Sequence, residues 1–290
     1  MGAFYDLVFP RFREPREGAP AGDGAATITW LGTAAHVVST ATTTVLIDPY
    51  VSRHRLRQVA TQRLEPDEGA IERWIPKKVD AILCGHSHYD HLLDAPRIAK
   101  KTGAKLVGSV TTCAFARAEG VAEEKLVCVP REGARVTIGD VAVRFVPSKH
   151  GRIALGRVPF PGEVRSPPRL PARASAYKMG GAFGVVLDAA GLRVYHNGSA
   201  DLIDAELEGE RADVLLVGLA GRQSTPNYLA RLLAALSPSV VVPTHHDAFF
   251  APLEAGVHLL PGIDLEGFTS EVRRHAPDAR IAWRGYGEAI

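Results

Sequence analysis

The feature that most restricts the fold of this chain is an apolar run that leads directly into a histidine-rich loop. Val79–Cys84 has the length and apolar character of a short buried strand. Residues 85–91 then read Gly-His-Ser-His-Tyr-Asp-His, so three imidazoles and a carboxylate follow the carboxyl end of that strand. Active sites of α/β proteins gather at such strand ends. We therefore expect a sheet that carries a polar site at one edge.

The spacing of these side chains suits a metal site. In extended backbone His86 and His88 point to the same side, because side chains alternate with a period of two, so both can bind one ion. Asp90 and His91 follow the turn and can reach a second ion about 3.5–4 Å away, as in two-metal hydrolytic sites. A solvated polar loop, or a helix start capped by Asp90, would explain the same residues without metal. The density and order of the ligands favour the metal site.

The rest of the chain alternates between strand and helix patterns. Helices are expected at 94–101, 111–119, 228–236 and 265–275. Strands are expected at 27–31, 37–47, 79–84, 105–108, 136–147 (a hairpin), 183–188, 192–196, 214–219, 240–243 and 280–283. Two β-rich stretches, each followed by helices, predict an α/β protein: an αββα sandwich of two mixed β-sheets with helices on the outer faces. We expect one domain over residues 26–290, preceded by an irregular arm over residues 1–25.

Composition argues against several classes of protein. The chain has 34 basic and 32 acidic residues and a formal charge of +2, so its total charge does not indicate a nucleic-acid partner. No apolar run approaches the roughly 20 residues of a membrane helix, and the N-terminus lacks the basic region of a signal peptide. We therefore expect a cytoplasmic protein. Its three cysteines, Cys84, Cys113 and Cys128, are too few for a disulfide framework and are expected to be reduced.

Residues 151–175 form an unusual insertion with five prolines, five arginines and one acidic residue. Proline removes ladder donors and breaks helices, so a regular element is excluded. Such a segment is a functional lid or a disordered tract. Guanidinium groups match phosphate or carboxylate oxygens in pairs, so Arg152 and Arg157 are candidates to bind an anionic substrate. Phe160 and Tyr177 could add an apolar wall. A solvated, charged loop is the alternative.

The string His86–Asp94 resembles the metal-binding motif of the metallo-β-lactamase superfamily. Its continuation, Tyr-Asp-His-Leu-Leu-Asp, resembles the branch that includes N-acyl phosphatidylethanolamine phospholipase D and ascorbate-6-phosphate lactonase. Thr29–Ala34 and Leu46–Pro49 are similar to the opening strands of that branch. The resemblance spans roughly residues 27–250 and implies two divalent metal ions, zinc first, with manganese or iron as alternatives.

The resemblance also implies ligands outside the loop. His150, at the end of Pro-Ser-Lys-His, matches the third imidazole of the first metal. His245, in Pro-Thr-His-His, matches the last histidine of the second metal. His246 would then support the ligands or face the substrate, although spacing alone allows the two histidines to be exchanged.

The expected bridging carboxylate is where the chain departs from the family pattern. The family has a Gly-Asp pair, whereas Gly198 is followed here by Ser199. Asp201, two residues further on, is the predicted bridging ligand, because two nearby dications need anionic ligands. Asp204 is another candidate. Alternatively the bridge is missing, and His86, His88 and His150 hold a single metal.

The implied chemistry is hydrolysis by a metal-activated water that attacks a carbonyl carbon or a phosphorus atom. Asp90 would orient or deprotonate that water. We expect an anionic small-molecule substrate, in the first place a phosphodiester or another phosphorylated compound. Lactone or ester hydrolysis on the same site is the alternative, and a di-iron redox protein or a metal-binding protein without hydrolytic activity is a third possibility.

Overall fold

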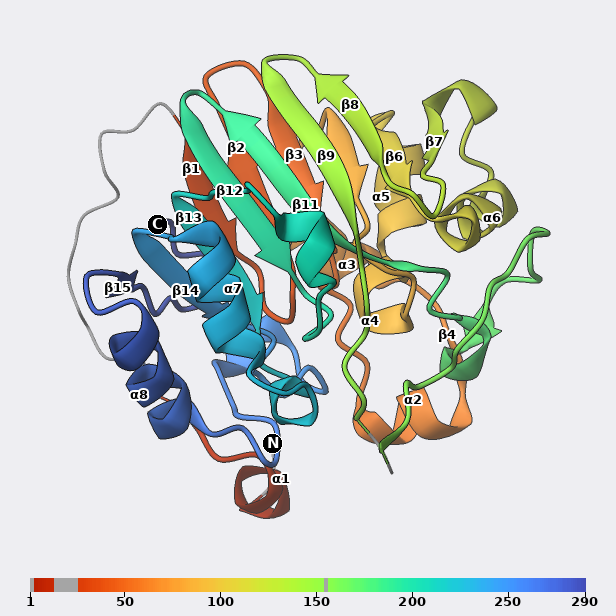
Figure 1. Cartoon of the computed structure of the whole chain (residues 1–290). Coiled ribbons are helices and arrows are strands. Elements are labelled where there is room, and N and C mark those ends of the chain that lie inside the picture. Colours follow the sequence, from red (N-terminus) through yellow and green to blue (C-terminus); the bar gives the residue numbers. More distant parts are fainter. Residues whose placement is uncertain (1–2, 13–25, 154–155) are drawn as a thin grey trace.

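Two β-sheets packed face to face form the centre of the computed structural model, which describes residues 3–12, 26–153 and 156–290 (Figure 1). The first sheet has the order β1-β2-β3-β5-β6-β7. Its first three strands pair antiparallel and the later ones parallel. The strands are β1 (Thr27–Trp30), β2 (His36–Ser39), β3 (Thr44–Ile47), β5 (Ala81–Leu83), β6 (Lys105–Gly108) and β7 (Leu126–Cys128).

The second sheet has the order β15-β14-β13-β12-β11-β9-β8. Strands β8, β9, β11 and β12 pair antiparallel, and strands β12, β13, β14 and β15 pair parallel. Its members are β8 (Ala134–Ile138), β9 (Val141–Ser148), β11 (Ala182–Ala189), β12 (Leu192–Asn197), β13 (Val214–Gly218), β14 (Val240–Thr244) and β15 (Arg280–Ile281). A small separate ladder joins β4 (Arg63–Leu64) to β10 (Ala172–Arg173).

Helices cover the outer faces of both sheets (Figure 1). The α-helices are α1 (Ala3–Val8), α2 (Leu56–Thr61), α3 (Glu68–Trp74), α4 (Tyr89–Leu92), α5 (Ala95–Thr102), α6 (Val110–Glu119), α7 (Tyr228–Leu236) and α8 (Leu265–His275). Short 3-10 turns are η1 (Glu123–Lys125), η3 (Ala174–Ala176), η4 (Asp204–Leu207), η5 (Arg222–Ser224) and η6 (Leu253–Ala255). No helix among the described residues combines the length and the apolar character needed to cross a bilayer.

Alternating side chains of the strands divide the core into three apolar layers. In β5, Ala81 and Leu83 pack between the sheets, whereas Ile82 packs beneath α5 and α6. In β13, Leu216 packs between the sheets, and Leu215 packs beneath α7 and α8. Because side chains alternate along a strand, a sheet covered on both faces needs continuous apolar runs. The predicted αββα sandwich is confirmed.

Two local predictions require correction. Residues 37–47 form two strands rather than one, because a turn closed by the Thr40 amide and the Thr43 carbonyl separates β2 from β3. Cys113 and Cys128 form a disulfide, so the prediction of three reduced cysteines is wrong for this pair. Helix α6 lies beside β7 and holds the two Cα atoms 5.9 Å apart, within the range that a disulfide spans. Cys84 is a buried free thiol, as predicted.

The predicted irregular arm is only partly described. Residues 3–8 form helix α1, and Arg11 makes an isolated β-bridge with His258. Residues 13–25 lie outside the described part of the chain. In the insertion at 151–175, β10 pairs with β4, and Ile153 and Arg157 are joined by a backbone hydrogen bond. The described part of the insertion is therefore tied to the body of the protein.

Candidate metal centre

The histidine-rich loop is held at the place where the two sheets meet. Strand β5 ends at Leu83, and Gly85 follows two residues later. The Gly85 amide donates to Oδ1 of Asp48 at 2.7 Å, and its carbonyl accepts from the Phe183 amide of β11 at 2.8 Å. A Cβ at position 85 would lie 3.2 Å from the Phe183 carbonyl oxygen. Glycine at this position therefore permits the close approach of the second sheet, and helix α4 carries the loop onward.

The first group of candidate ligands consists of His86, His88 and His150. Each ring offers one nitrogen as a ligand atom, and these three nitrogens all lie within 4.8 Å of one another. The ring centroids of each pair are 4.8 Å apart. His150 lies two residues beyond the end of β9, at the same end of the sandwich. The structure therefore brings together the three imidazoles that the sequence assigned to one metal.

Hydrogen bonds at the rear of two of these rings determine which nitrogens face inward. Nε2 of His88 donates to the Pro159 carbonyl at 2.8 Å, and Nδ1 of His150 donates to the Gly151 carbonyl at 2.7 Å. A neutral imidazole that donates from one nitrogen keeps a lone pair on the other. Nε2 of His86 is buried and has no hydrogen-bond partner among the described residues. Buried polar atoms are normally satisfied, so this nitrogen is suited to bind a metal ion.

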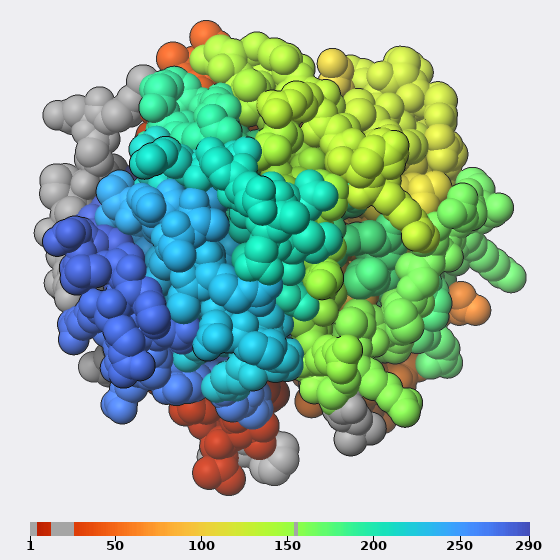
Figure 2. Space-filling model, in the orientation of Figure 1, coloured from red at the N-terminus to blue at the C-terminus, as the bar shows by residue number. Residues whose placement is uncertain are grey.

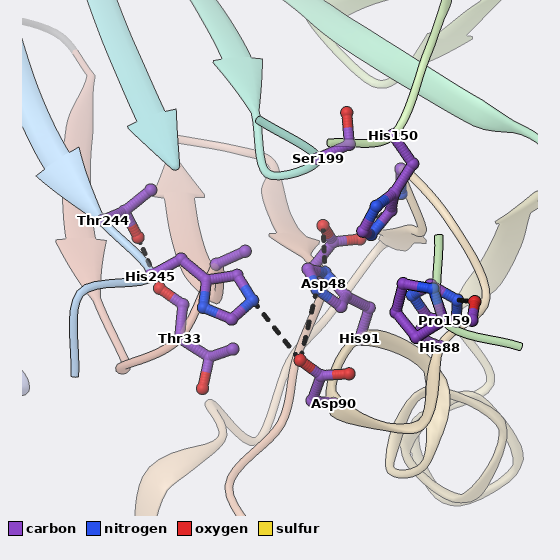
Figure 3. Close-up of polar contacts among 12 residues, drawn as sticks. Thr33, Asp48, His88, Asp90, His91, His150, Pro159, Ser199, Thr244 and His245 are labelled. Atoms are coloured by element: carbon purple, nitrogen blue, oxygen red, sulfur yellow. Dashed lines mark hydrogen bonds and ion pairs between the residues drawn. The ribbon is translucent and has the colours of Figure 1, made fainter. Parts of the chain in front are cut away.

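The second group consists of Asp90, His91 and His245 (Figure 3). Oδ2 of Asp90 lies 3.3 Å from Nε2 of His245 and 3.6 Å from Nε2 of His91. Nδ1 of His91 donates to Oδ2 of Asp48 at 2.8 Å, which leaves Nε2 of His91 free to bind metal. The rings of His86 and His91 are 3.7 Å apart, so the two groups share a wall.

Burial sets the charge of these groups. It lowers the pKa of His86 far below its usual value, with help from the neighbouring imidazoles. It also lowers the pKa of His88 to about 4 and that of His150 to about 3. For Asp90, burial opposes ionisation, but His91 and His245 outweigh it and lower the pKa of the carboxyl group. The neutral imidazoles of His86, His88 and His150 and the ionised carboxylate of Asp90 are donors of the kind that a divalent transition metal requires.

His245 is placed by a buried polar cluster that the sequence did not predict. The residue has φ of +52° and its amide donates to the Thr33 carbonyl at 2.8 Å. Two residues later, Asp247 accepts hydrogen bonds from the Thr33 amide (2.8 Å), Arg53 (2.7 Å) and the Tyr286 hydroxyl (2.8 Å). This cluster joins four distant segments, and no local pattern marks it. Asp48 did have a local signal, since it follows an apolar strand and precedes a proline.

Asp201 is not brought into either group. Its Oδ1 accepts from the following amide, that of Leu202, at 2.8 Å. Ser199 donates to Oδ1 of Asn197, and its hydroxyl points away from the imidazoles (Figure 3). Asp204 is paired with Arg231 at the surface. The carboxylate of Asp48 lies beside Gly198, since its Oδ2 would be 3.2 Å from a Cβ at that position. With His86 and His91, Asp48 forms a third group of possible ligands.

The residues predicted to bind substrate lie elsewhere. His246 is 1% exposed and stacks on Trp30 with ring centroids 4.9 Å apart, and burial lowers its pKa to about 4. Tyr177 stacks on Phe115 with centroids 4.2 Å apart. Arg152 and Arg157 are exposed and do not line the metal cavity. Of the two adjacent histidines, it is His245 that faces Asp90.

A cavity of about 220 Å³ opens onto both ligand groups. Beyond the ligands, its walls are mainly apolar and its described lining contains no lysine or arginine. The lining residues are His86, His88, Tyr89, Asp90, His91, His150, Ile153, Pro159, Phe160, Gly198, Ala220, His245, Phe249 and Leu260.

Comparison with known proteins agrees with this fold. Residues 27–245 match the family model described as a Beta-lactamase superfamily domain. The chain belongs to the metallo-β-lactamase superfamily and is a metal-dependent hydrolase of that class.

Among its relatives is a UPF0173 metal-dependent hydrolase of Anaeromyxobacter sp. (strain K), which is 30% identical over 269 residues, covering 90% of this chain and 88% of the relative. The protein MK1542 of Methanopyrus kandleri, of the same description, is 28% identical over 273 residues, covering 90% of this chain and 98% of the relative. The metallo hydrolase Igni18 of Ignicoccus hospitalis shares the fold, with a TM-score of 0.58 and 20% identity over 91% of this chain and 97% of that protein.

Proposed function

We propose that this chain hydrolyses a small ester or lactone with the aid of two divalent metal ions, zinc in the first place and manganese or iron as alternatives. The observation that carries the proposal is the pair of ligand groups at the base of one cavity. His86, His88 and His150 would hold one ion. Asp90, His91 and His245 would hold the other. Ions of this kind, when bound, activate water and polarise the oxygen of the electrophile.

The protein's own groups would orient the reaction. The carboxylate of Asp90 lies between two imidazoles at the cavity base and can accept a hydrogen bond or a proton from the attacking water. Asp48 and the Pro159 carbonyl fix the tautomers of His91 and His88, so that the lone pairs face inward. The apolar walls would restrict bulk water, which strengthens electrostatic interactions within the site.

The size and lining of the cavity favour a small substrate with a carbonyl electrophile. Its volume of about 220 Å³ is below the roughly 300–1,000 Å³ of common small-molecule sites. The arginines expected to bind an anion do not line it. A small phosphodiester is the second candidate, favoured by Lys178, whose Nζ lies 6.0 Å from the Phe160 ring centroid.

A substrate panel on metal-free and metal-loaded protein tests this proposal. We expect chelation to abolish hydrolysis and zinc, manganese or iron to restore it. With metal bound, 4-nitrophenyl acetate and simple lactones should be turned over faster than bis(4-nitrophenyl) phosphate. The reverse preference would support the phosphodiesterase alternative. Turnover that survives exhaustive chelation, or dioxygen consumption without hydrolysis, would overturn the proposal.

A further inference from the structure

Two large apolar side chains are exposed at the mouth of the metal cavity. Ile153 is 51% exposed and Phe160 is 37% exposed, and both line the cavity. Only four large hydrophobic residues of the described chain are this exposed, and the other two, Leu7 and Leu56, are not in the cavity lining. In Figure 2 the green atoms that follow residue 150 form part of the outer surface. Exposed apolar side chains that gather at one concave site indicate ligand contact.

The backbone holds these side chains in place at some cost. Phe160 has φ of +39°, in the left-handed region that bulky residues rarely adopt. The Met179 amide donates to the Phe160 carbonyl at 3.0 Å and secures this conformation. Ile153 packs over Gly221: a Cβ at position 221 would lie 3.2 Å from the Cγ1 atom of Ile153. Backbone strain that the surroundings enforce is concentrated at functional sites.

The same segment contacts a metal ligand. Pro159, which precedes Phe160, accepts the hydrogen bond from Nε2 of His88 at 2.8 Å. The Phe160 ring lies edge-on to the His88 ring, with centroids 6.5 Å apart. Phe249 and Leu260 also line the cavity and add to its apolar wall. A hydrocarbon group bound here would therefore lie directly beside the reacting atoms.

We propose that Ile153 and Phe160 form a subsite for the hydrocarbon part of the substrate, which makes the substrate class an ester or lactone with an aliphatic acyl chain. This inference rests on the proposed function and specifies the part of the substrate that the enzyme selects, an aliphatic acyl chain. Full burial of one methylene is worth about fourfold in binding. Because the two side chains are partly open to solvent, we expect a gain of about twofold per methylene.

A chain-length series tests the subsite. With metal-loaded enzyme, kcat/KM for 4-nitrophenyl esters should rise about twofold per methylene from acetate to hexanoate. Ile153→Ala and Phe160→Ala should reduce that gain, with hexanoate losing more than acetate and the metal content unchanged. Phe160→Leu should retain most of it. Leu56→Ala, which removes an equally exposed side chain on α2, is the control and should leave the series unchanged.

Two outcomes separate this inference from the proposed function. If all esters are hydrolysed but wild-type kcat/KM does not depend on chain length, the subsite is wrong and the hydrolase proposal stands. If no ester is hydrolysed, calorimetric titration with propanol, hexanol and octanol decides. Affinity that rises with chain length and falls in Phe160→Ala would support the subsite without the proposed reaction. Affinity that is independent of length would overturn it.

Discussion

At the scale of single residues, the site depends on which nitrogen of each imidazole carries the proton. His91 donates from Nδ1 to Asp48, so that Nε2 faces Asp90. Asp48 itself has φ of +44° and is fully buried, with its other oxygen bonded to the Gly85 amide. One carboxylate thus positions both His91, a candidate ligand, and the loop that carries the candidate ligands His86, His88 and Asp90.

We expect Asp48→Asn to weaken binding of the second ion by about 10–100-fold, the usual effect of removing an outer hydrogen-bond partner. The ion held by His86, His88 and His150 should be retained. Zinc titration followed by calorimetry measures the two sites separately. Asp201→Asn is the matched control and should leave both affinities unchanged, because Asp201 lies outside the two groups. If Asp201→Asn loses one ion instead, Asp201 is the bridge that the sequence predicted.

At the scale of elements, local sequence patterns were sufficient to predict most strands and helices. Helices α7 and α8 and strand β6 have the expected bounds, because their apolar periodicity and flanking residues are local signals. His150 and His245 were predicted from the resemblance to the metallo-β-lactamase superfamily, and each lies just beyond a strand, β9 or β14. The Asp247 cluster could not be predicted, since it depends on contacts between distant segments: Thr33 and Asp247 are 214 positions apart. The disulfide joins cysteines only 15 positions apart, but it depends on how helix α6 packs beside β7.

The segment that follows β14, which carries His245 and Asp247, allows a prediction about stability. Asp247 and Arg53 form a buried ion pair, so Asp247→Asn leaves a buried guanidinium without its counterion. We expect the free energy of unfolding to fall by about 3–5 kcal/mol. Asp204→Asn removes an ion pair at the surface and should cost less than about 1 kcal/mol. Urea denaturation of the metal-free proteins makes the comparison, and equal losses in the two variants would show that the buried cluster does not hold this segment.

At the scale of the whole molecule, stability should depend on buried neutral histidines. Burial lowers the pKa of His36 to about 3 and that of His246 to about 4, both outside the ligand groups. Below the unfolded value of about 6.5, the unfolded chain binds protons that the folded chain does not, so stability falls as the pH falls. His91 has a raised pKa and acts in the opposite direction, but the lowered imidazoles outnumber it.

We therefore expect the thermal midpoint of the metal-free protein to decrease between pH 7.5 and pH 5. Carboxyl groups, with usual values of about 4, contribute little over this interval. Differential scanning fluorimetry in the presence of a chelator provides the measurement. A midpoint that is constant or rises on acidification would show that the buried imidazoles are not held neutral.

We propose that the side chains gathered just beyond the ends of β5, β9 and β14 bind two metal ions. The most direct test of this claim is the metal content, by mass spectrometry of the elements, of wild-type protein and the His86→Ala/His88→Ala variant after reconstitution with zinc. We predict two ions per wild-type chain, with one ion lost and hydrolysis abolished in the variant. Unchanged metal content and undiminished turnover in the folded variant would contradict the account.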